Sequence, residues 1–323
     1  MHILDDALRM GYVRGSVLLR ERYAAPWAVS IPHADELRTI LGCNRLSRPV
    51  AFHLVEYGDC HIRVAHKKPV RLSAGDVAIC FGGVSHEVAT GAPTRAVPVR
   101  TLLTAGARTP ARPSSAGVAL LCGVFTLQDT GVNPLLAALP TLVRASTAQP
   151  GALHNLSGAA RLLVEEVARV GPSGSYVTER LLDIVCAETI RAHIETSHDL
   201  AGWFRGLKDP VIGRVIAAMH RAPGAQWSIP RLAREVSLSP SRFGARFSSS
   251  VGESPMSYLT RWRMNIACRR LATLDEGIED IATAVGYESV PAFTRAFKRM
   301  VGLAPGQFRK RAVSSATDHT AGG

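Results

Sequence analysis

The side chains with the clearest chemistry are the basic residues in the last third of the chain. Positions 211–323 hold 16 Lys and Arg against 8 Asp and Glu, whereas positions 1–210 hold 22 against 18. Most of the basic residues are Arg, whose planar fork pairs with phosphate or guanine edges better than Lys does. This excess favours a nucleic-acid partner, although a basic segment can also be a plain solvated surface.

Residue patterns for catalysis are absent from the sequence. It contains no Ser/His/Asp or GxSxG arrangement and no phosphate-cradling glycine loop. Six cysteines are scattered without CxxC spacing, which predicts reduced thiols rather than disulfides: Cys43, Cys60, Cys80, Cys122, Cys186 and Cys268. The N-terminus is acidic, unlike a signal peptide, and no apolar run is long enough to span a membrane. A cytoplasmic protein with no membrane partner is expected.

A degenerate internal repeat must position the basic residues. Residues 229–255 recur at 278–305: four apolar positions return 49 residues later, and the Phe, Phe, Val, Gly, Pro series from Phe243 returns 50 residues later from Phe293. Each copy predicts a short helix, a tight turn and a second helix, beginning at Ser239-Pro240 in the first copy. Two such units in a basic segment indicate two helices that enter DNA major grooves. A plain helical bundle is the structural alternative.

Two residues at the predicted turns differ between the copies. Gly286 suits the left-handed backbone that such a turn often needs, whereas the first copy has Ser237 there, which predicts mild strain.

Between the copies, 255–272 predicts a connecting helix about 27 Å long. This length is near the roughly 34 Å between successive major grooves on one face of DNA.

The first half of the chain has a different pattern. Short apolar runs predict strands at 15–19, 27–31, 51–55, 61–65, 69–72, 76–81 and 118–125, as in an antiparallel barrel or sandwich. Helices are predicted at 133–143, 156–170 and 175–195. The last two carry more apolar residues than a connector needs, which favours self-association or packing on the barrel: Leu162, Leu163, Val167, Leu181, Leu182 and Val185.

The last hundred residues resemble the DNA-binding domain of AraC-type transcriptional regulators. The matching segments are LAREVSLSPSRFGARF, SPMSYLTRWRM and IATAVGYESVPAFTRAFKRMVGLAPGQFR. The first half is similar to the cupin-like sensor domain of one branch of that family, through PW at 26–27, FHLVEYGDC at 52–60, LSAGDVAICFGGVSHEV at 72–88 and NPLLAALP at 133–140.

The resemblance implies an α+β protein with four parts. These are a cupin-like β-barrel sensor domain at 1–130, a helical dimerisation region at 131–208, an all-α domain with two helix-turn-helix units joined by a long helix at 209–312, and a disordered tail at 313–323. It also implies a homodimeric, effector-responsive regulator, an activator in our interpretation, whose partners are promoter DNA, RNA polymerase and a small-molecule effector.

The family's base-reading positions can be transferred residue by residue. They lie early in the second helix of each unit, and they match Ser241, Arg242, Val290, Pro291, Thr294 and Arg295, with Arg246 as an additional reader. Gly244 and Ala245 also match but lack reach. Arg261, Arg263 and Lys298 are candidate phosphate contacts.

The cupin-like half suggests an effector pocket lined by His53, Phe81 and His86. Metal-binding cupins use two histidines, a glutamate and a later histidine, but Leu54-Val55 follow His53, so the HxH pair is missing, and Phe81 stands where Pro is usual. A zinc or copper site with nitrogen and sulfur ligands has weak candidates in His53, His61, His86 and Cys122. Structural histidines and a core cysteine are the favoured interpretation, so no cofactor is assigned.

Two other function classes remain at this point. One is a cupin-type metal-dependent enzyme, or a redox or metal sensor acting through Cys43, Cys60 or Cys80, fused to a DNA-binding domain. The other is a nucleoid-packing protein without sequence preference, for which a sensor domain would have no use. Protection of one discrete operator would separate a regulator from both.

Overall fold

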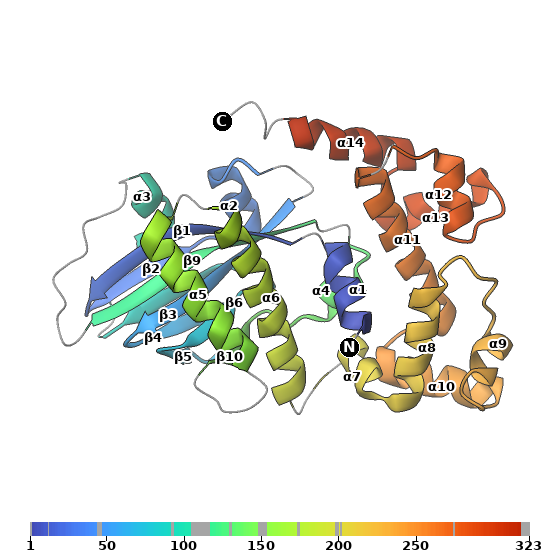
Figure 1. Cartoon of the computed structure of the whole chain (residues 1–323), viewed down its shortest axis with the longest axis horizontal. Coiled ribbons are helices and arrows are strands. Elements are labelled where there is room, and N and C mark those ends of the chain that lie inside the picture. The colour runs from blue at the N-terminus through green and yellow to red at the C-terminus, as the bar shows by residue number, and fades with distance from the viewer. Residues whose placement is uncertain are drawn as a thin grey trace. The chain divides into compact units, whose positions relative to one another are not determined.

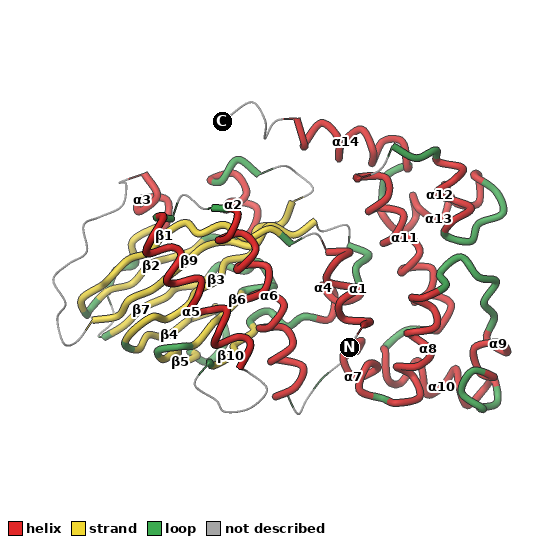
Figure 2. Tube along the Cα trace, in the orientation of Figure 1, coloured by secondary structure: helices red, strands yellow, loops and turns green. Residues whose placement is uncertain are grey.

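The computed structural model describes residues 2–11, 13–43, 47–91, 94–104, 117–128, 131–147, 154–172, 175–197, 200, 202–273 and 275–317 (Figures 1 and 2). The chain forms two compact units. The sheet unit comprises 13–127 and 139–197, and the helical unit comprises 1–12, 128–138 and 198–323. No helix in the described ranges is long and apolar enough to cross a membrane.

The sheet unit is a sandwich of two five-stranded sheets. The first has the strand order β1-β9-β3-β6-β10 and the second the order β5-β4-β7-β2-β8. The strands are β1 (Arg14–Ala24), β2 (Trp27–Ile31), β3 (Ser47–Tyr57), β4 (Asp59–Val64), β5 (Val70–Ser73), β6 (Asp76–Ile79), β7 (His86–Thr90), β8 (Val97–Pro98), β9 (Gly117–Gln128) and β10 (Val143–Ser146).

The predicted closed barrel is wrong, whereas the predicted strands are confirmed. Within the described residues each sheet keeps its own two edge strands, so the sheets face each other without closing. The predicted helix at 133–143 is also wrong beyond its first turn. Helix α4 (Pro134–Ala138) is short, and Val143 begins strand β10, which pairs with β6. Pro140 lies between the two elements, where its ring and missing N–H disfavour a continuous helix.

The core of the sheet unit lies between the two sheets. Alternate residues of β3, Ala51 and Val55, belong to it together with Ile62 of β4 and Val88 of β7. Because side chains alternate across a strand, residues at even spacing from these also point into the space between the sheets. Strand β3 is nearly buried on both faces, and its other face carries Phe52, whose ring lies 4.8 Å from that of Phe125.

Four helices accompany the two sheets: α2 (Ala34–Ile40), α3 (Val99–Thr104), α5 (His154–Val170) and α6 (Tyr176–Thr196). Helix α6 packs on β1, β10 and α5. Four of the apolar residues that predicted self-association are buried within this unit: Leu163, Val167, Leu182 and Val185. Of the predicted residues, Leu162 is exposed, and the other exposed apolar side chains of α5 and α6 were not predicted: Val170, Tyr176, Val177 and Ile184.

The helical unit contains both copies of the sequence repeat. Its helices are α1 (His2–Gly11), α4, α7 (Gly202–Lys208), α8 (Pro210–Arg221), α9 (Ile229–Arg234), α10 (Pro240–Val251), α11 (Pro255–Thr273), α12 (Ile278–Ala284), α13 (Val290–Val301) and α14 (Pro305–Thr317). The predicted helix-turn-helix pairs are α9–α10 and α12–α13, with α11 as the connecting helix. Residues 313–317 of the expected tail lie in α14, and 318–323 lie outside the described residues.

Two segments from the first half of the sequence complete this unit. Helix α1 packs against α4, α8 and α11, and α4 packs against α7. Asn133 fixes the α1–α4 contact, because its side-chain nitrogen donates to the carbonyl of Ala7 at 3.1 Å and its oxygen accepts from the backbone N–H of Leu135 at 2.9 Å. The NPLLAALP motif therefore caps α4 and holds the N-terminal helix.

The connecting helix is anchored by buried aromatic residues. The indole N–H of Trp203 donates to the hydroxyl of Tyr258 at 2.9 Å, and that hydroxyl lies 2.7 Å from His220 Nε2. The His220 ring stacks on Trp262 at 3.6 Å between centroids. Burial lowers the pKa of His220 to about 3, so this ring is neutral at neutral pH. These contacts join α7, α8 and α11 into one body.

The two helix-turn-helix turns differ as the sequence predicts. Ser237 has a φ of +54° and Gly286 has a φ of +83°, so the same left-handed turn is made once by serine and once by glycine. A Cβ on Gly286 would lie 2.7 Å from the Arg263 guanidinium and 2.8 Å from the carbonyl oxygen of Gly224. Glycine is needed at that turn for space as well as for φ.

We expect Ser237→Gly to raise the free energy of unfolding of the full chain by about 0.5–1 kcal/mol, because it relieves the left-handed strain. Gly286→Ser should lower it by more than about 1 kcal/mol. Denaturant melts followed by circular dichroism measure both. Ser248→Gly, in the middle of α10, is the control and should lower stability by about 0.5 kcal/mol. A loss of stability in Ser237→Gly would contradict the assigned strain.

Candidate nucleic-acid interface and sensor site

Helix α10 presents the predicted base-reading residues of the first unit to solvent. Ser239 caps the helix by accepting from the backbone N–H of Arg242. Phe243 and Phe247 are fully buried, with ring centroids 5.8 Å apart, and they fix the opposite face of α10 against the unit's core. Ser241, Arg242 and Arg246 are therefore exposed on the outer face, as a reading helix requires.

Helix α13 repeats this arrangement in the second unit. Ser289 accepts from the N–H of Ala292, and Phe293 and Phe297 are fully buried. The outer face carries the predicted readers: Pro291 and Arg295 are exposed, and Val290 and Thr294 are half-buried. Within the described residues, neither Arg295 nor Arg242 has a side-chain hydrogen bond or ion pair. Both guanidinium groups are available to a ligand.

Two other predicted contact residues are held by acidic partners. Arg246 donates from Nε and Nη2 to the two carboxylate oxygens of Asp209, each at 2.9 Å. Asp209 also caps α8, so Arg246 links α10 to α8. Arg261 forms an ion pair with Glu253. A base or phosphate contact by either arginine would require this pairing to be shared or broken. Lys298, in contrast, is exposed on α13.

Arg263, predicted to hold phosphate, is bonded to the protein itself. Its Nε donates to the carbonyl of Pro223 and its Nη2 to the carbonyl of Ala225, both at 2.8 Å. Its guanidinium also lies 5.9 Å from the ring centroid of Tyr287, and burial lowers its pKa. Arg263 thus connects α11 to the loop before α9 and to the turn after α12. Sequence reasoning missed this role, because nothing local marks a long-range contact to backbone carbonyls.

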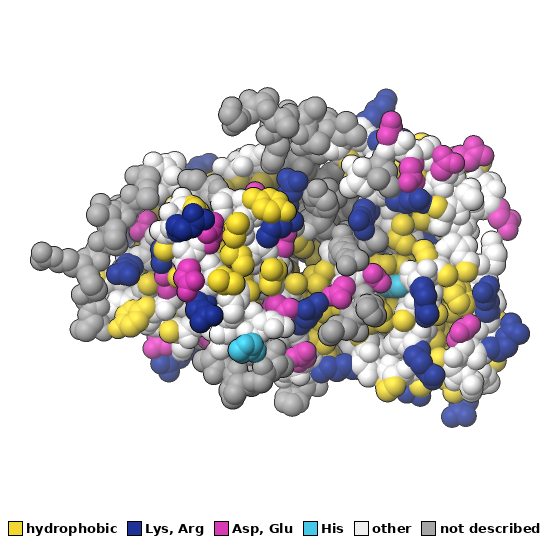
Figure 3. Space-filling view, in the orientation of Figure 1, with side chains coloured by type: hydrophobic (Ala, Val, Ile, Leu, Met, Phe, Trp, Pro, Cys, Tyr) yellow, Lys and Arg dark blue, Asp and Glu magenta, His cyan; other side chains and the backbone are white. Residues whose placement is uncertain are grey.

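Charge is distributed unevenly over the helical unit. In Figure 3, Lys and Arg side chains lie over α8, α9 and α10, whereas Asp and Glu side chains gather over α12. Glu279 and Asp280 occupy the first turn of α12, where their negative charges interact favourably with the positive end of the helix dipole. The exposed basic residues of the α12–α13 pair therefore lie on α13: Arg295, Lys298 and Arg299.

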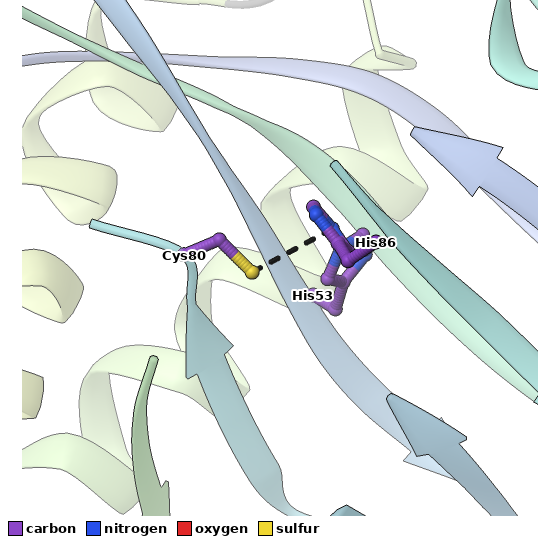
Figure 4. A group of neighbouring side chains, drawn as sticks. All are labelled: His53, Cys80 and His86. Atoms are coloured by element: carbon purple, nitrogen blue, oxygen red, sulfur yellow. Dashed lines mark hydrogen bonds between the residues drawn. The ribbon is translucent and has the colours of Figure 1, made fainter. Parts of the chain in front are cut away.

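Three nitrogen and sulfur side chains, His53, Cys80 and His86, meet between the sheets of the other unit (Figure 4), and Cys122 lies beside His53. His53 lies on β3 between Ala51 and Val55, Cys80 follows β6, and His86 begins β7, so pleat alternation directs all three inward. His53 Nε2 is 2.9 Å from His86 Nε2, and Cys80 Sγ is 3.6 Å from the same His86 atom. On the other side, His53 Nδ1 is 3.1 Å from Cys122 Sγ of β9.

Burial keeps this cluster neutral. Desolvation lowers the pKa of both histidines, His53 the more strongly because His86 adds an unfavourable charge. Burial raises the pKa of Cys80 to about 12 and raises that of Cys122 as well. The redox alternative through a low-pKa thiolate loses its basis, because the pKa of Cys43 is also raised and that of Cys60 reaches about 12.

The remaining sensor candidates are separated. Phe81, the residue after Cys80, is buried. His61 is exposed on β4 and takes no part in the cluster. Cys80 was not among the metal candidates from sequence. It stands six residues before His86 on the inward-facing side of β6, and this spacing was the available signal.

A cavity of about 550 Å³ opens on the second sheet, and His86 is the one predicted pocket residue in its wall. His53 and Phe81 do not line it. Its charged lining residues are Glu36, Arg63, Glu87 and Arg100, and its apolar ones include Ile31, Val64 and Val99. A cavity of this size, with convergent polar groups on an apolar wall, suits a small ligand.

These features define a two-unit DNA-binding domain joined to a cupin-type sandwich, and comparisons with known proteins agree. The model of the cupin family matches residues 2–195, and that of a helix-turn-helix domain matches residues 232–311. A putative AraC-like transcription regulator of Streptomyces lividans is 31% identical over 266 residues, covering 81% of this chain and 87% of the relative. The chain therefore belongs to the AraC-like transcription regulators, with a cupin-like N-terminal domain.

Other similar proteins carry related names. The HTH-type transcriptional regulator AlkR of Acinetobacter baylyi is 28% identical over 266 residues, which cover 80% of this chain and 87% of the relative. A solved structure of the DNA-binding domain of AdpA in complex with a target DNA is 29% identical, with a TM-score of 0.31, and covers 32% of this chain and 92% of that one.

We expect Arg263→Ala to lower the free energy of unfolding by about 2–4 kcal/mol, because two charge-assisted hydrogen bonds to backbone carbonyls are lost. Denaturant melts measure this, with the exposed Arg234→Ala as control, which should stay within about 0.5 kcal/mol of the wild type. The salt dependence of DNA binding should keep its slope. A slope lowered by about one, with stability unchanged, would instead make Arg263 a phosphate contact.

Proposed function

We propose that the protein is a sequence-specific transcriptional regulator that reads DNA with α10 and α13. The observation that supports this most directly is the pair of exposed, unpartnered arginines Arg242 and Arg295 near the starts of these two helices. Arg242 lies three residues and Arg295 six residues after a serine N-cap, and the other face of each helix is fixed by two buried phenylalanines. Bidentate arginine contacts to guanine are a common form of direct readout.

The two helices contribute unequally to this reading. On α10 the neighbouring positions are Gly244 and Ala245, and Arg246 is already paired with Asp209, so Arg242 and Ser241 remain for base edges. On α13, Thr294 and Arg295 supply hydrogen bonds, and Val290 and Pro291 supply apolar surface for thymine methyl groups. Lys298 contacts phosphate. Arg261 also contacts phosphate, through the guanidinium N–H groups that its ion pair with Glu253 does not use. We infer that α13 carries most of the base specificity.

Control of this activity is assigned to the cupin-like domain. A small effector binds in the cavity that His86 helps to form, with Arg63 and Arg100 available to its polar groups. The effector can change the protein's affinity for DNA only as far as it binds one state of the protein more tightly than another. Because this coupling is reciprocal, bound DNA changes the protein's affinity for the effector by the same factor. The protein acts in the cytoplasm, as an activator that recruits RNA polymerase and not as an enzyme.

Self-association uses the exposed apolar side chains of α5 and α6. Tyr176 is 77% exposed, Leu162 50%, and Val177 and Ile184 47% each. Val177 and Ile184 are seven residues apart and lie on one face of α6. An apolar stripe of this kind is unfavourable in water and suits the symmetric interface of a homodimer.

We expect Arg295→Ala to weaken binding to a selected operator by about 1–3 kcal/mol and to relax base choice at one position. The operator is first obtained by selecting bound sequences from a random duplex library with full-length protein and then confirmed by footprinting. The matched control is Arg299→Ala, one turn further along α13, which should weaken all sequences alike. An unchanged base preference in Arg295→Ala, or no enriched sequence in the selection, would contradict the proposed function.

We expect the full chain to be a dimer at tens of micromolar, and Val177→Glu with Ile184→Glu to make it monomeric, because two charges would be buried at the interface. Multi-angle light scattering measures the mass. Tyr57→Glu, at a residue 58% exposed on β3, is the control and should leave the dimer intact. A monomeric wild type, or a dimeric double variant, would rule out this face.

A further inference from the structure

The four-residue cluster between the sheets has a defined chain of hydrogen bonds. His86 Nδ1 lies 3.1 Å from the carbonyl oxygen of Val84, which can only accept, so His86 carries its proton on Nδ1. Its Nε2 is then a bare lone pair facing His53 Nε2. In the neutral cluster, the Cys122 thiol donates to His53 Nδ1, and His53 Nε2–H donates to His86. Both nitrogens of each imidazole ring then have a hydrogen-bond partner, and a single proton lies between the two Nε2 atoms.

The same atoms are arranged as ligands. His53 Nε2, His86 Nε2 and Cys80 Sγ all lie within 4.8 Å of one another and are buried. Tetrahedral coordination with bonds of about 2.05 Å to nitrogen and about 2.3 Å to sulfur places two nitrogens about 3.3 Å apart and nitrogen and sulfur about 3.5 Å apart. The observed separations are 2.9 Å and 3.6 Å. The third separation, between the His53 nitrogen and Cys80 Sγ, lies within 4.8 Å, so small shifts of His53 relative to both partners complete the geometry.

We propose that His53, Cys80 and His86 form a binding site for a thiolate-seeking d10 metal cation, zinc(II) or copper(I). This ligand set differs from the two histidines, glutamate and further histidine of metal-binding cupins. Among the described residues no carboxylate joins the group. Imidazole and thiolate ligands select borderline and soft cations, whereas the iron and manganese of cupin enzymes favour sets that include a carboxylate.

Binding shifts two protons. The Cys80 thiol gives its proton to solvent and becomes the thiolate ligand. His53 moves its single proton from Nε2 to Nδ1 by exchange with solvent, so that Nδ1–H now donates to Cys122 Sγ while the Cys122 thiol keeps its own proton. Cys122 does not touch the metal and is a positioning residue, because it is the hydrogen-bond partner that fixes the tautomer of a ligand.

Charge balance fits a buried site for either cation. Copper(I) with one thiolate and two neutral imidazoles is neutral. Zinc(II) with the same ligands has one positive charge, which a bound hydroxide neutralises, since zinc lowers the pKa of its water to about 7. His86 also lines the 550 Å³ cavity, so one of the three ligand residues borders a cavity.

A cation bound at this site would link the two sheets of the sandwich. His53 and Cys80 belong to the sheet that contains β3 and β6, whereas His86 belongs to the sheet that contains β7. A cation bound to all three cross-links the sandwich at its centre and stabilises the folded domain by mass action. This inference deepens the sensor role proposed above, but it does not depend on which DNA sequence is read.

The test is direct metal binding by full-length protein, purified under reductant and stripped of metal. Zinc(II) and copper(I) are each titrated anaerobically against a competing chromogenic chelator, and cobalt(II) serves as a spectroscopic probe. We expect one equivalent per chain, a higher melting temperature and a thiolate-to-cobalt charge-transfer band. Competition between the two cations identifies the tighter one. Absence of a stoichiometric site, or a cobalt spectrum without the thiolate band, would overturn the proposal.

Variants separate ligation from structure. Cys80→Ser should abolish the charge-transfer band, and His53→Ala should lower affinity more than tenfold. Controls are Cys186→Ala, an equally buried thiol on α6, and the exposed His61→Ala, both of which should bind as the wild type does. Cys122→Val should lower affinity roughly 10–100-fold, and Cys122→Ser, which keeps an acceptor, should recover most of it. Equal loss in the controls would also overturn the site.

Failure of this inference can be told apart from failure of the proposed function. The same protein samples are tested for operator footprinting. Protein that binds the operator but no metal overturns the metal site alone, and protein that binds metal but selects no DNA sequence overturns the regulator alone.

Discussion

The rigidity of α11 is the constraint on which DNA reading depends. Its 19 residues span about 28 Å, so the two reading helices can meet successive grooves only if this spacing is fixed. The Tyr258 hydroxyl and the His220–Trp262 stack hold α11 to α7 and α8, and Arg263 joins it to both helix-turn-helix units. Because the span is shorter than the roughly 34 Å repeat of straight DNA, the proposed readout requires the operator to bend toward the protein or the reading helices to lean outward.

The two copies of the repeat have diverged in opposite directions. The first has lost reach on its reading helix, where Gly244 and Ala245 stand, and has tied Arg246 to Asp209. It also accepts a strained Ser237 at its turn. The second copy has Gly286 at the turn and exposed reading side chains on α13. Its first helix, α12, is acidic in its first turn. In the proposed readout, the first copy therefore contributes mainly position and charge, and the second contributes sequence discrimination.

Local pattern predicted much of this structure and little of its long-range chemistry. The duplicated helices, their serine caps and the left-handed turns follow from spacing alone, as do most of the strands. Strand β10 was not predicted, and its first residue, Val143, was assigned to the helix at 133–143, because Val143–Ser146 becomes a strand only by pairing with β6. The long-range contacts of Arg263 and Cys80 were not predicted, for a related reason. Their roles depend on the loop at 223–225 and on His86 across the sandwich, and neither partner is visible from neighbours in sequence.

The division of the chain between its units shows where a signal can pass. The cupin match runs through residues 2–195, yet residues 1–12 and 128–138 fold with the DNA-binding helices. Strand β9 carries Cys122, the partner of His53, and ends at Gln128, the residue at which the chain enters the helical unit. A few residues later Asn133 holds α1 and α4. In the proposed sensor, a change in the His53 tautomer acts on a strand that is covalently continuous with the segment carrying α4, which packs on α1 and α7. Any ligand that favours one arrangement of the cluster can bias that packing by its difference in affinity and by no more.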